Sequence, residues 1–266
     1  MTTVRYEHED GIATITLDRP ESLNSMTAEF MDDLRAAVGE VERDPTVRVA
    51  VLTGAGRGFC SGADLSGVDQ NADPALAGDA TASGMDDHFH PAIRALADLQ
   101  VPTISKINGV AAGGGFGLAM TCDIAIAGRS AFFVSTFGPR LGIVPDLGTT
   151  WHLAHRAGKA RAKGIAMLGE RITADQAKEW GLIWDVVDDE QLDKAVNEVA
   201  TQLARSSAMA MTRIRNAMDA ATSNTLSEQL DVEREHQRVL IPQNMAEGAA
   251  AFLEKREPDF APRSDS

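Results

Sequence analysis

Polar and apolar positions near the N-terminus fit a hairpin followed by a helix. The runs 4–9 and 12–17 are rich in β-forming residues and flank an Asp-Gly pair at 10–11, which is typical of a tight turn between antiparallel strands. Thr27 can cap a helix over about 28–43. The apolar positions of that segment recur at helical spacing, namely Phe30, Leu34, Ala37, Val38 and Val41. The predicted order is therefore strand, strand, helix.

Continuous apolar runs predict strands that are buried on both faces. The runs 47–52 and 103–107 have this character. Shorter strands are expected at 124–127 and 132–134, and a helix at about 91–99. Strands that alternate with helices in this way indicate an α/β core.

The remaining patterns predict a loop and a helical C-terminal part. Residues 66–84 are rich in Ala, Gly, Asp and Ser without a clear period, so we expect a mobile surface loop that could act as a lid. Thr173 begins a capping box, and Gly181 follows the end of that short helix. Longer amphipathic helices are predicted at 190–205, 208–220, 226–240 and 245–255. We expect an α/β core over residues 1–190 and a helical region over residues 191–266.

Composition narrows the classes of protein that fit this pattern. The chain has 266 residues, 44% of them apolar, which is enough for a sizeable core, and it has no apolar run that would span a membrane. Its net charge of −14 disfavours nucleic-acid binding, because a field of that sign repels phosphate. The cysteines are Cys60 and Cys122, and the N-terminus has no signal-peptide pattern. We expect a cytoplasmic protein without a disulfide framework or a zinc cluster.

Two glycine-bearing turns each follow a predicted strand. One contains Ser61-Gly62-Ala63, and the other is the glycine run 113–115, which can open a helix to about residue 121. Glycine lets the backbone approach a ligand closely, and a helix N-terminus offers unpaired N–H donors. Two such donors that converge on one oxygen would form an oxyanion hole, although either turn alone would also suit a purely structural role.

Further motifs accompany these turns along nearly the whole chain. They are Leu17-Asp18-Arg19-Pro20, Leu23-Asn24-Ser25-Met26, Gly58-Phe59-Cys60-Ser61-Gly62-Ala63-Asp64-Leu65, Ile107-Asn108-Gly109-Val110-Ala111-Ala112-Gly113-Gly114-Gly115, Cys122-Asp123-Ile124, Leu141-Gly142-Ile143-Val144-Pro145-Asp146 and Glu179-Trp180-Gly181-Leu182. Taken together and in this order, they resemble the enoyl-CoA hydratase/isomerase (crotonase) superfamily.

The resemblance implies a fold, an assembly and a substrate. The fold would be a crotonase-like spiral of ββα units with a C-terminal helical trimerisation region, assembled as homotrimers or hexamers. The substrate would be an acyl-CoA thioester. No cofactor beyond coenzyme A, no metal, and no nucleic acid or membrane partner is expected.

The resemblance also implies the residues of the site. The N–H groups of Ala63 and Gly114 would be the oxyanion-hole donors. Lys255 resembles the family's C-terminal cation near the nucleotide phosphate, and a solvated helix end explains Lys255 equally well. Backbone that would receive the nucleotide and the pantetheine lies at Ser22, Leu23, Ser61, Gly62, Asp64 and Leu65.

The acid–base residues depart from the hydratase pattern of this family. Its two glutamate positions fall on Gly117 and Gly138, which cannot transfer a proton, and the missing side chains suggest room for a ring or a branched acyl chain. Asp146 resembles the acid/base of dienoyl-CoA isomerases and of ring-1,2-epoxyphenylacetyl-CoA isomerases, and the C-terminal half of the chain resembles the latter most. Capping of the next helix is the alternative role for Asp146.

We therefore expect an isomerase that shifts a double bond or opens an aryl epoxide. Asp146 would move a proton on an enolate held by Ala63 and Gly114, with its pKa raised by an apolar pocket.

Three other functions stay open. The chain could be an enoyl-CoA hydratase-type lyase, or an acyl-CoA-binding scaffold without turnover. It could also be an aryl-CoA dehalogenase with Asp146 as the nucleophile and His90 as the base. In that case Phe137 stands near the place of a tryptophan that holds the aryl ring. A surface or helix-start role is the simpler explanation of His90.

Overall fold

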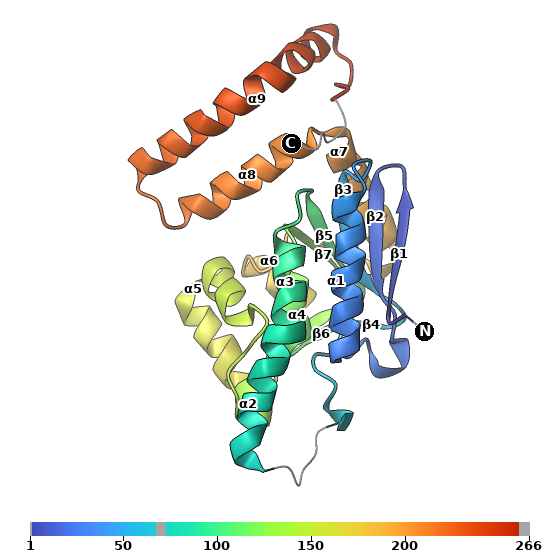
Figure 1. Cartoon of the computed structure of the whole chain (residues 1–266), viewed down its shortest axis with the longest axis vertical. Coiled ribbons are helices and arrows are strands. Elements are labelled where there is room, and N and C mark those ends of the chain that lie inside the picture. The colour runs from blue at the N-terminus through green and yellow to red at the C-terminus, as the bar shows by residue number, and fades with distance from the viewer. Residues whose placement is uncertain (1, 68–72, 261–266) are drawn as a thin grey trace.

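The computed structural model describes residues 2–67 and 73–260, and two β-sheets organise this part of the chain (Figure 1). The six-stranded sheet has the order β1-β2-β3-β5-β7-β10, and the four-stranded sheet has the order β4-β6-β8-β9. Neighbouring strands run parallel, except that β1 and β9 are antiparallel to their neighbours at one edge of each sheet. The strands are β1 (Val4–Glu9), β2 (Ile12–Leu17), β3 (Val49–Gly54), β4 (Gly58–Cys60), β5 (Thr103–Ile107), β6 (Val110–Ala112), β7 (Ile124–Gly128), β8 (Phe132–Val134), β9 (Ile172–Thr173) and β10 (Asp185–Val187).

Helices cover both faces of the six-stranded sheet. The α-helices are α1 (Ala28–Arg43), α2 (Pro74–Gly84), α3 (His90–Ala97), α4 (Gly114–Thr121), α5 (Thr149–Leu168), α6 (Ala174–Glu179), α7 (Leu192–Arg205), α8 (Ala208–Ala221) and α9 (Leu226–Glu254). Short 3₁₀ turns are η1 (Pro20–Ser22), η2 (Leu65–Gly67) and η5 (Asp189–Gln191), and two π-helical turns are η3 (Met85–Phe89) and η4 (Phe137–Leu141). None of the described helices is both long and apolar enough to cross a membrane.

The buried strand β3 explains why both faces of the sheet are covered. Ala50 and Leu52 point into the main core, while Val49 and Val51 pack on the opposite face with residues of α7. This alternation follows from the two-residue period of a strand and confirms the prediction that this run is buried on both faces. Helix α7 therefore closes that second face, and α8 begins at Ala208.

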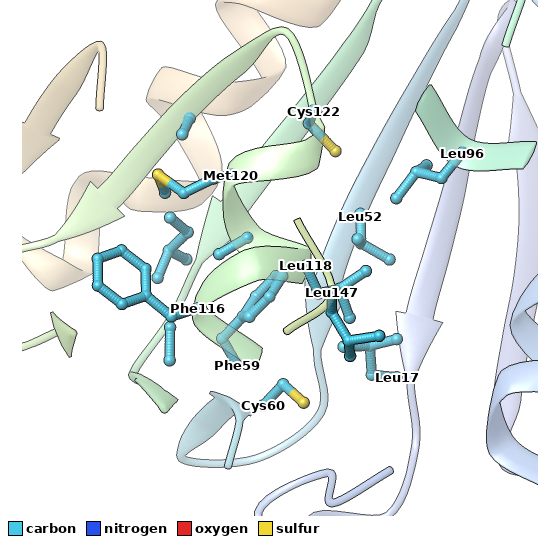
Figure 2. Close-up of a cluster of buried hydrophobic side chains, with 14 of the residues drawn as sticks. Leu17, Leu52, Phe59, Cys60, Leu96, Phe116, Leu118, Met120, Cys122 and Leu147 are labelled. Atoms are coloured by element: carbon cyan, nitrogen blue, oxygen red, sulfur yellow. The ribbon is translucent and has the colours of Figure 1, made fainter. Parts of the chain in front are cut away.

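Helix α4 lies in the centre of the main core (Figure 2). All of its residues are buried, and Phe116, Leu118 and Met120 pack with Phe59 and other apolar side chains of the cluster. A helix that is apolar on all sides is typical of a fully buried position. The α4 backbone passes so close to β4 that a Cβ atom at Gly115 would collide with the β4 backbone.

Several local predictions are confirmed. Asp10 and Gly11 both have left-handed backbone conformations, as the tight hairpin turn requires. Thr27 caps α1 by accepting a 3.2 Å hydrogen bond from the Phe30 N–H. The capping box at Thr173 is also present.

The expected mobile loop over 66–84 is wrong where the structure describes it. Residues 68–72 lie outside the described residues, but 74–84 form α2, which continues through the π-helical turn η3 into α3. Alanine is the strongest helix former, and Pro74 stands at the first helical position, where a proline is tolerated. The absence of an apolar period reflects an exposed helix, not a missing one.

The C-terminal helices form a hairpin that projects from the core in Figure 1. Arg215 of α8 joins it to the core through hydrogen bonds to carbonyl oxygens of Leu99 and Val101, both 2.6 Å, and an ion pair with Asp123. We expected separate helices at 226–240 and 245–255, and this is wrong, because α9 continues through Pro242. A proline removes one helical hydrogen bond, and the turns on both sides keep the helix continuous.

Candidate active site

The candidate site lies where the parallel strands β4, β6 and β8 end. Because these strands are parallel neighbours, the turns that follow them meet at one edge of the smaller sheet. The turns carry residues 61–63, 113–114 and 136–137. Ligands of α/β proteins bind at the carboxyl ends of parallel strands, so the topology alone favours this edge.

A cavity of about 270 Å³ opens at this edge. Its lining residues are Met26, Ser61, Ala63, Leu65, Thr81, Gly84, Met85, Phe89, Gly113, Gly114, Thr136, Phe137, Leu141, Ile143, Asp146 and Leu147. Most of these side chains are apolar, and among the described lining residues only Asp146 carries a titratable group. The cavity therefore combines an apolar wall with a single carboxylate.

Two backbone N–H groups in the cavity wall are available to a ligand. Met26 pairs with the turn through hydrogen bonds to its neighbours at Gly62 and Asp64, which leaves the Ala63 N–H between them. Gly114 is the first residue of α4, so its N–H has no partner within the helix. Within the described part of the chain, neither N–H donates to a protein acceptor.

Gly62 lets the two turns approach each other. Its φ is +95°, and a Cβ atom there would lie 2.8 Å from the Ala112 carbonyl oxygen and 3.4 Å from the Gly114 nitrogen. The sequence prediction that the two glycine turns converge is met in this respect, because the turns of Gly62 and Gly114 are in contact.

Asp146 reaches the cavity from the turn before α5. Leu147 and Gly148 both have left-handed conformations, with φ of 48° and 77°, and the Thr149 N–H closes the turn with a 2.9 Å hydrogen bond to the Asp146 carbonyl oxygen. The helix is capped by Gly148, with no side-chain cap. The alternative role of Asp146 as an N-cap is therefore wrong.

The Asp146 carboxylate is partly buried, and one of its oxygens, Oδ1, lacks a hydrogen-bond partner among the described residues. Burial raises its pKa above the ordinary value, and the backbone of Asp146 itself and the charge of His90 partly offset this. A Cβ atom at Gly114 would lie 3.4 Å from this Oδ1, so the carboxylate stands beside one of the free N–H groups.

His90 does not line the cavity. It starts α3, and its Nδ1 lies 3.3 Å from Asp86 Oδ1. Its influence on Asp146 is electrostatic.

The two glycines at the hydratase positions do not line the cavity either. A Cβ atom at Gly117 would collide with the Leu147 carbonyl oxygen and lie 2.6 Å from Thr149 Oγ1. Gly138 is exposed in η4, with the Ala166 carbonyl oxygen 3.3 Å from its Cβ position. The expectation that Gly117 leaves room for the acyl group is wrong, because the turn after Asp146 fills that space.

The expected coenzyme A residues form a hydrogen-bonded segment next to the cavity. Ser61 donates its side-chain hydroxyl to the Ser22 carbonyl oxygen over 3.0 Å and its N–H to the Leu23 carbonyl oxygen over 2.9 Å. Asp64 accepts hydrogen bonds from Ser66 and Arg19, and these hold its pKa well below the usual range. Its carboxylate braces the turn that presents Ala63.

Lys255 is not brought to the cavity within a single chain. It ends α9 in a left-handed conformation, and the hairpin of α8 and α9 projects away from α4 in Figure 1. Its role near the nucleotide stays a prediction.

Sequence reasoning missed the side chains that α2 and η3 contribute. Thr81, Gly84, Met85 and Phe89 line the cavity. Met26 and Thr136 line it as well, and the sequence analysis named neither as a site residue. The spacing of positions 81, 84, 85 and 89 is helical, so a helical interpretation of this segment would have placed these four residues on one face.

Comparison with known proteins agrees with this geometry. The enoyl-CoA hydratase/isomerase family model matches residues 7–263. The 1,2-epoxyphenylacetyl-CoA isomerase of Escherichia coli (strain K12) is 46% identical over 253 residues, which cover 95% of each chain. A probable enoyl-CoA hydratase of Rhodobacter capsulatus is 38% identical over 268 residues, with 98% of each chain covered.

Solved structures lead to the same family. The crystal structure of an enoyl-CoA hydratase from Polaromonas sp. JS666 superposes with a TM-score of 0.90 at 32% identity and covers 97% of this chain and 99% of that chain. A mixed α/β fold with parallel sheets is thus shared with enoyl-CoA hydratases of known structure. The chain belongs to the enoyl-CoA hydratase/isomerase family, with the crotonase fold.

Proposed function

We propose that this protein is an acyl-CoA isomerase with Asp146 as its proton shuttle. The observation that carries the proposal is the Asp146 carboxylate, which is the one titratable group among the described residues of a mostly apolar cavity. Its Oδ1 has no hydrogen-bond partner in the described part of the chain and lies next to the free N–H of Gly114. The similarity to a 1,2-epoxyphenylacetyl-CoA isomerase supports an isomerase over a hydratase, although related proteins also carry hydratase names.

The free N–H groups would act on the thioester. The carbonyl oxygen would accept hydrogen bonds from Ala63 and Gly114, and negative charge on that oxygen would be stabilised as an enolate forms. One such donor contributes about 2.7–4 kcal/mol to a transition state. The helix N-terminus at Gly114 adds a partial positive charge on the same side.

Asp146 would move the proton. In a trans-3-enoyl thioester it would remove a proton from the α-carbon, the electron pair would pass through the thioester oxygen and the double bond, and the same carboxyl would return the proton at the γ-carbon. A pKa raised by burial suits a group that must both accept and donate a proton near neutral pH. With an aryl epoxide, the same oxyanion stabilisation would assist opening of the three-membered ring.

The hydratase route has less support. It needs two carboxylates to hold a water, and the described residues that line the cavity supply one. Dehalogenation would need His90 as the base, and His90 stands outside the lining with its Nδ1 toward Asp86.

The test follows a trans-3-enoyl-CoA and watches the conjugated thioester appear. We expect the wild type to convert it, and Asp146→Asn to lose about 10²–10⁴-fold in rate, the usual contribution of a general base. Asp79→Asn is the matched control, because Asp79 is an exposed carboxylate on α2. Aryl-epoxide thioesters follow as the second substrate class.

Other outcomes would reassign the site. Full activity in Asp146→Asn would remove Asp146 from the mechanism. Chloride release from a 4-chlorobenzoyl thioester would favour the dehalogenase. Tight binding of acyl-CoA without reaction on any of these thioesters would favour a scaffold.

We also propose that the chain assembles through its C-terminal helices, as a homotrimer or a hexamer. Apolar side chains are exposed along the hairpin of α8 and α9, among them Met218, Leu226, Leu230, Phe252 and Leu253, at 55–83% of their surface. Exposed apolar surface on this scale is typical of an interface. Light scattering of the purified protein would give the mass, and a monomer at micromolar concentration would contradict the proposal.

A further inference from the structure

The turn that carries Asp146 rests on one face of α4. Gly114 and Gly117 are three residues apart, so they lie on the same side of that helix. Leu147 contacts both positions, since a Cβ atom at Gly114 would lie 2.7 Å from Leu147 Cδ1 and one at Gly117 would meet the Leu147 carbonyl oxygen. Leu147 thus packs against α4 at two positions that have no side chain.

The contact at Gly117 involves backbone atoms, which cannot rotate away. A Cβ atom there would also lie 3.1 Å from the Leu147 carbonyl carbon and 2.6 Å from Thr149 Oγ1. Real Cβ atoms essentially never approach other heavy atoms closer than 3.0 Å, so any side chain at this position would push the whole turn outward. The absence of a side chain at residue 117 therefore determines how closely the turn after Asp146 can approach α4.

The turn has little freedom to absorb such a push. Leu147 already has a left-handed conformation, which costs a non-glycine residue about 1 kcal/mol. The 2.9 Å hydrogen bond from the Thr149 N–H to the Asp146 carbonyl oxygen fixes the other side. Displacement at Leu147 would therefore be transmitted to the adjacent Asp146.

We propose that Gly117 is a positioning residue whose missing side chain sets the distance between the Asp146 carboxylate and the oxyanion donor at Gly114. The inference rests on the proposed function of Asp146. It also implies that a carboxylate side chain at position 117 and Asp146 in its present place exclude each other sterically. A glutamate at 117 would then not add hydratase activity to the isomerase but would displace its base.

The first test is Gly117→Ala, assayed with the same 3-enoyl thioester. We expect kcat to fall about 10²-fold, the effect of a misplacement of about 1 Å, with a much smaller change in KM because the oxyanion hole and the coenzyme A segment are untouched. The matched control is Gly164→Ala in α5, where a Cβ atom meets no heavy atom within 4 Å. The control should keep wild-type kcat.

A pH profile separates positioning from a loss of stability. If the turn moves outward, Asp146 regains water, and the acid limb of kcat/KM moves to lower pH than in the wild type. His90 on α3, whose electrostatic interaction lowers the pKa of Asp146, is unaltered by the substitution. A variant that is only less stable would lose active protein without any shift of this limb.

A second pair of variants covers the case in which Gly117→Ala does not fold. Leu147→Gly relaxes the left-handed turn, so Gly117→Ala combined with Leu147→Gly can move the turn at little cost. We expect the double variant to have a lower kcat and a lower acid limb than Leu147→Gly alone. Equal kinetics of these two proteins would overturn the role of Gly117.

The outcome distinguishes this inference from the proposed function. If Asp146→Asn is inactive while Gly117→Ala keeps the wild-type kcat and pH profile, Asp146 is the base and Gly117 does not position it. If Asp146→Asn is fully active, the proposed function fails first.

Discussion

The two sides of the cavity are built by different means. Its floor consists of the turns 61–63 and 113–114, which are held by backbone hydrogen bonds and by contacts that leave no space for a Cβ atom at Gly62. Its cover consists of residues 81–89 of α2 and η3 with Leu141 and Ile143, and these two side chains are 44% and 52% exposed. The floor depends on missing side chains, and the cover depends on side chains that are present.

This difference separates chemistry from selectivity. N–H donors supplied by the backbone depend on the chain path and not on side-chain identity, so a rigid floor can serve any thioester. The cover can change by substitution without moving the floor, because loosely packed surface segments tolerate replacement. We therefore expect variants of the floor to lose the reaction and variants of the cover to change its substrate.

The largest effect is expected for Gly62→Ala in the floor. The φ of +95° strains any L-residue, and the new Cβ atom would lie 2.8 Å from the Ala112 carbonyl oxygen. Separation of the two turns would remove one oxyanion donor, so kcat/KM should fall about 10²–10³-fold, and the free energy of unfolding should fall by about 2 kcal/mol. Steady-state kinetics and urea unfolding measure the two effects.

Gly78→Ala in α2 is the control for Gly62→Ala. Its Cβ atom would meet no heavy atom within 4 Å, so the same chemical change should leave kcat/KM within about twofold and should favour the helix. Comparable losses in both variants would mean that the effect of Gly62→Ala does not come from the position of Gly62 in the floor.

A smaller effect, on selectivity, is expected for Phe89→Ala in the cover. Phe89 lines the cavity and is partly buried against the core. Its removal should lower kcat/KM for an aryl thioester about tenfold relative to a short 3-enoyl thioester, since apolar pocket contacts discriminate at about 1–3 kcal/mol. Competition between the two substrates in one mixture gives this ratio directly. An equal loss of kcat/KM for both substrates would mean that Phe89 supports the reaction itself and does not select the substrate.

Sequence patterns predicted the floor well, for a physical reason. Glycine turns after buried strands require a short-range signal only, and both turns have the expected positions at Gly62 and Gly114. The family resemblance drew attention to Asp146 and to its neighbours in the chain. What the sequence could not show is that the turn after Asp146 fills the space next to Gly117, because this contact joins segments that are far apart in the chain.

The cover was the part that sequence analysis misjudged. The composition of 74–84 suggested a loop, since Ala, Gly and Ser give no apolar period, but alanine favours a helix once the segment is anchored by η3 and α3. Phe137 lines the cavity, and its place near an acyl group stays a prediction from the resemblance. Lys255 lies at the end of α9 and does not line the cavity, so its role near the nucleotide stays a prediction from the resemblance.

The smallest expected effect concerns the free energy of unfolding, and it measures what burial of the charged Asp146 carboxylate costs the folded protein. Asp146 has a pKa that burial raises above its unfolded value, so the folded state binds a proton more tightly than the unfolded state does. The resulting contribution to the free energy of unfolding is fully present below the ordinary aspartate pKa of about 3.9. It is lost as the pH rises through the pKa that Asp146 has in the folded protein. An asparagine at position 146 stays neutral at every pH, so its contribution to stability does not change with pH. Asp146→Asn should therefore be more stable than the wild type at pH 7, by something of the order of 1 kcal/mol.

Urea unfolding of both proteins from about pH 4, close to the ordinary aspartate pKa, up to about pH 8 tests this sign. The stability difference should grow as the pH rises through the folded pKa of Asp146 and then level off, while activity is lost at every pH. Asp79→Asn, whose carboxylate is exposed, should show no such trend. A wild type that is more stable than Asp146→Asn at pH 7 would mean that the carboxylate has a partner that compensates its burial. The case for a raised pKa of Asp146, and the support that it gives to Asp146 as the base, would fall with it.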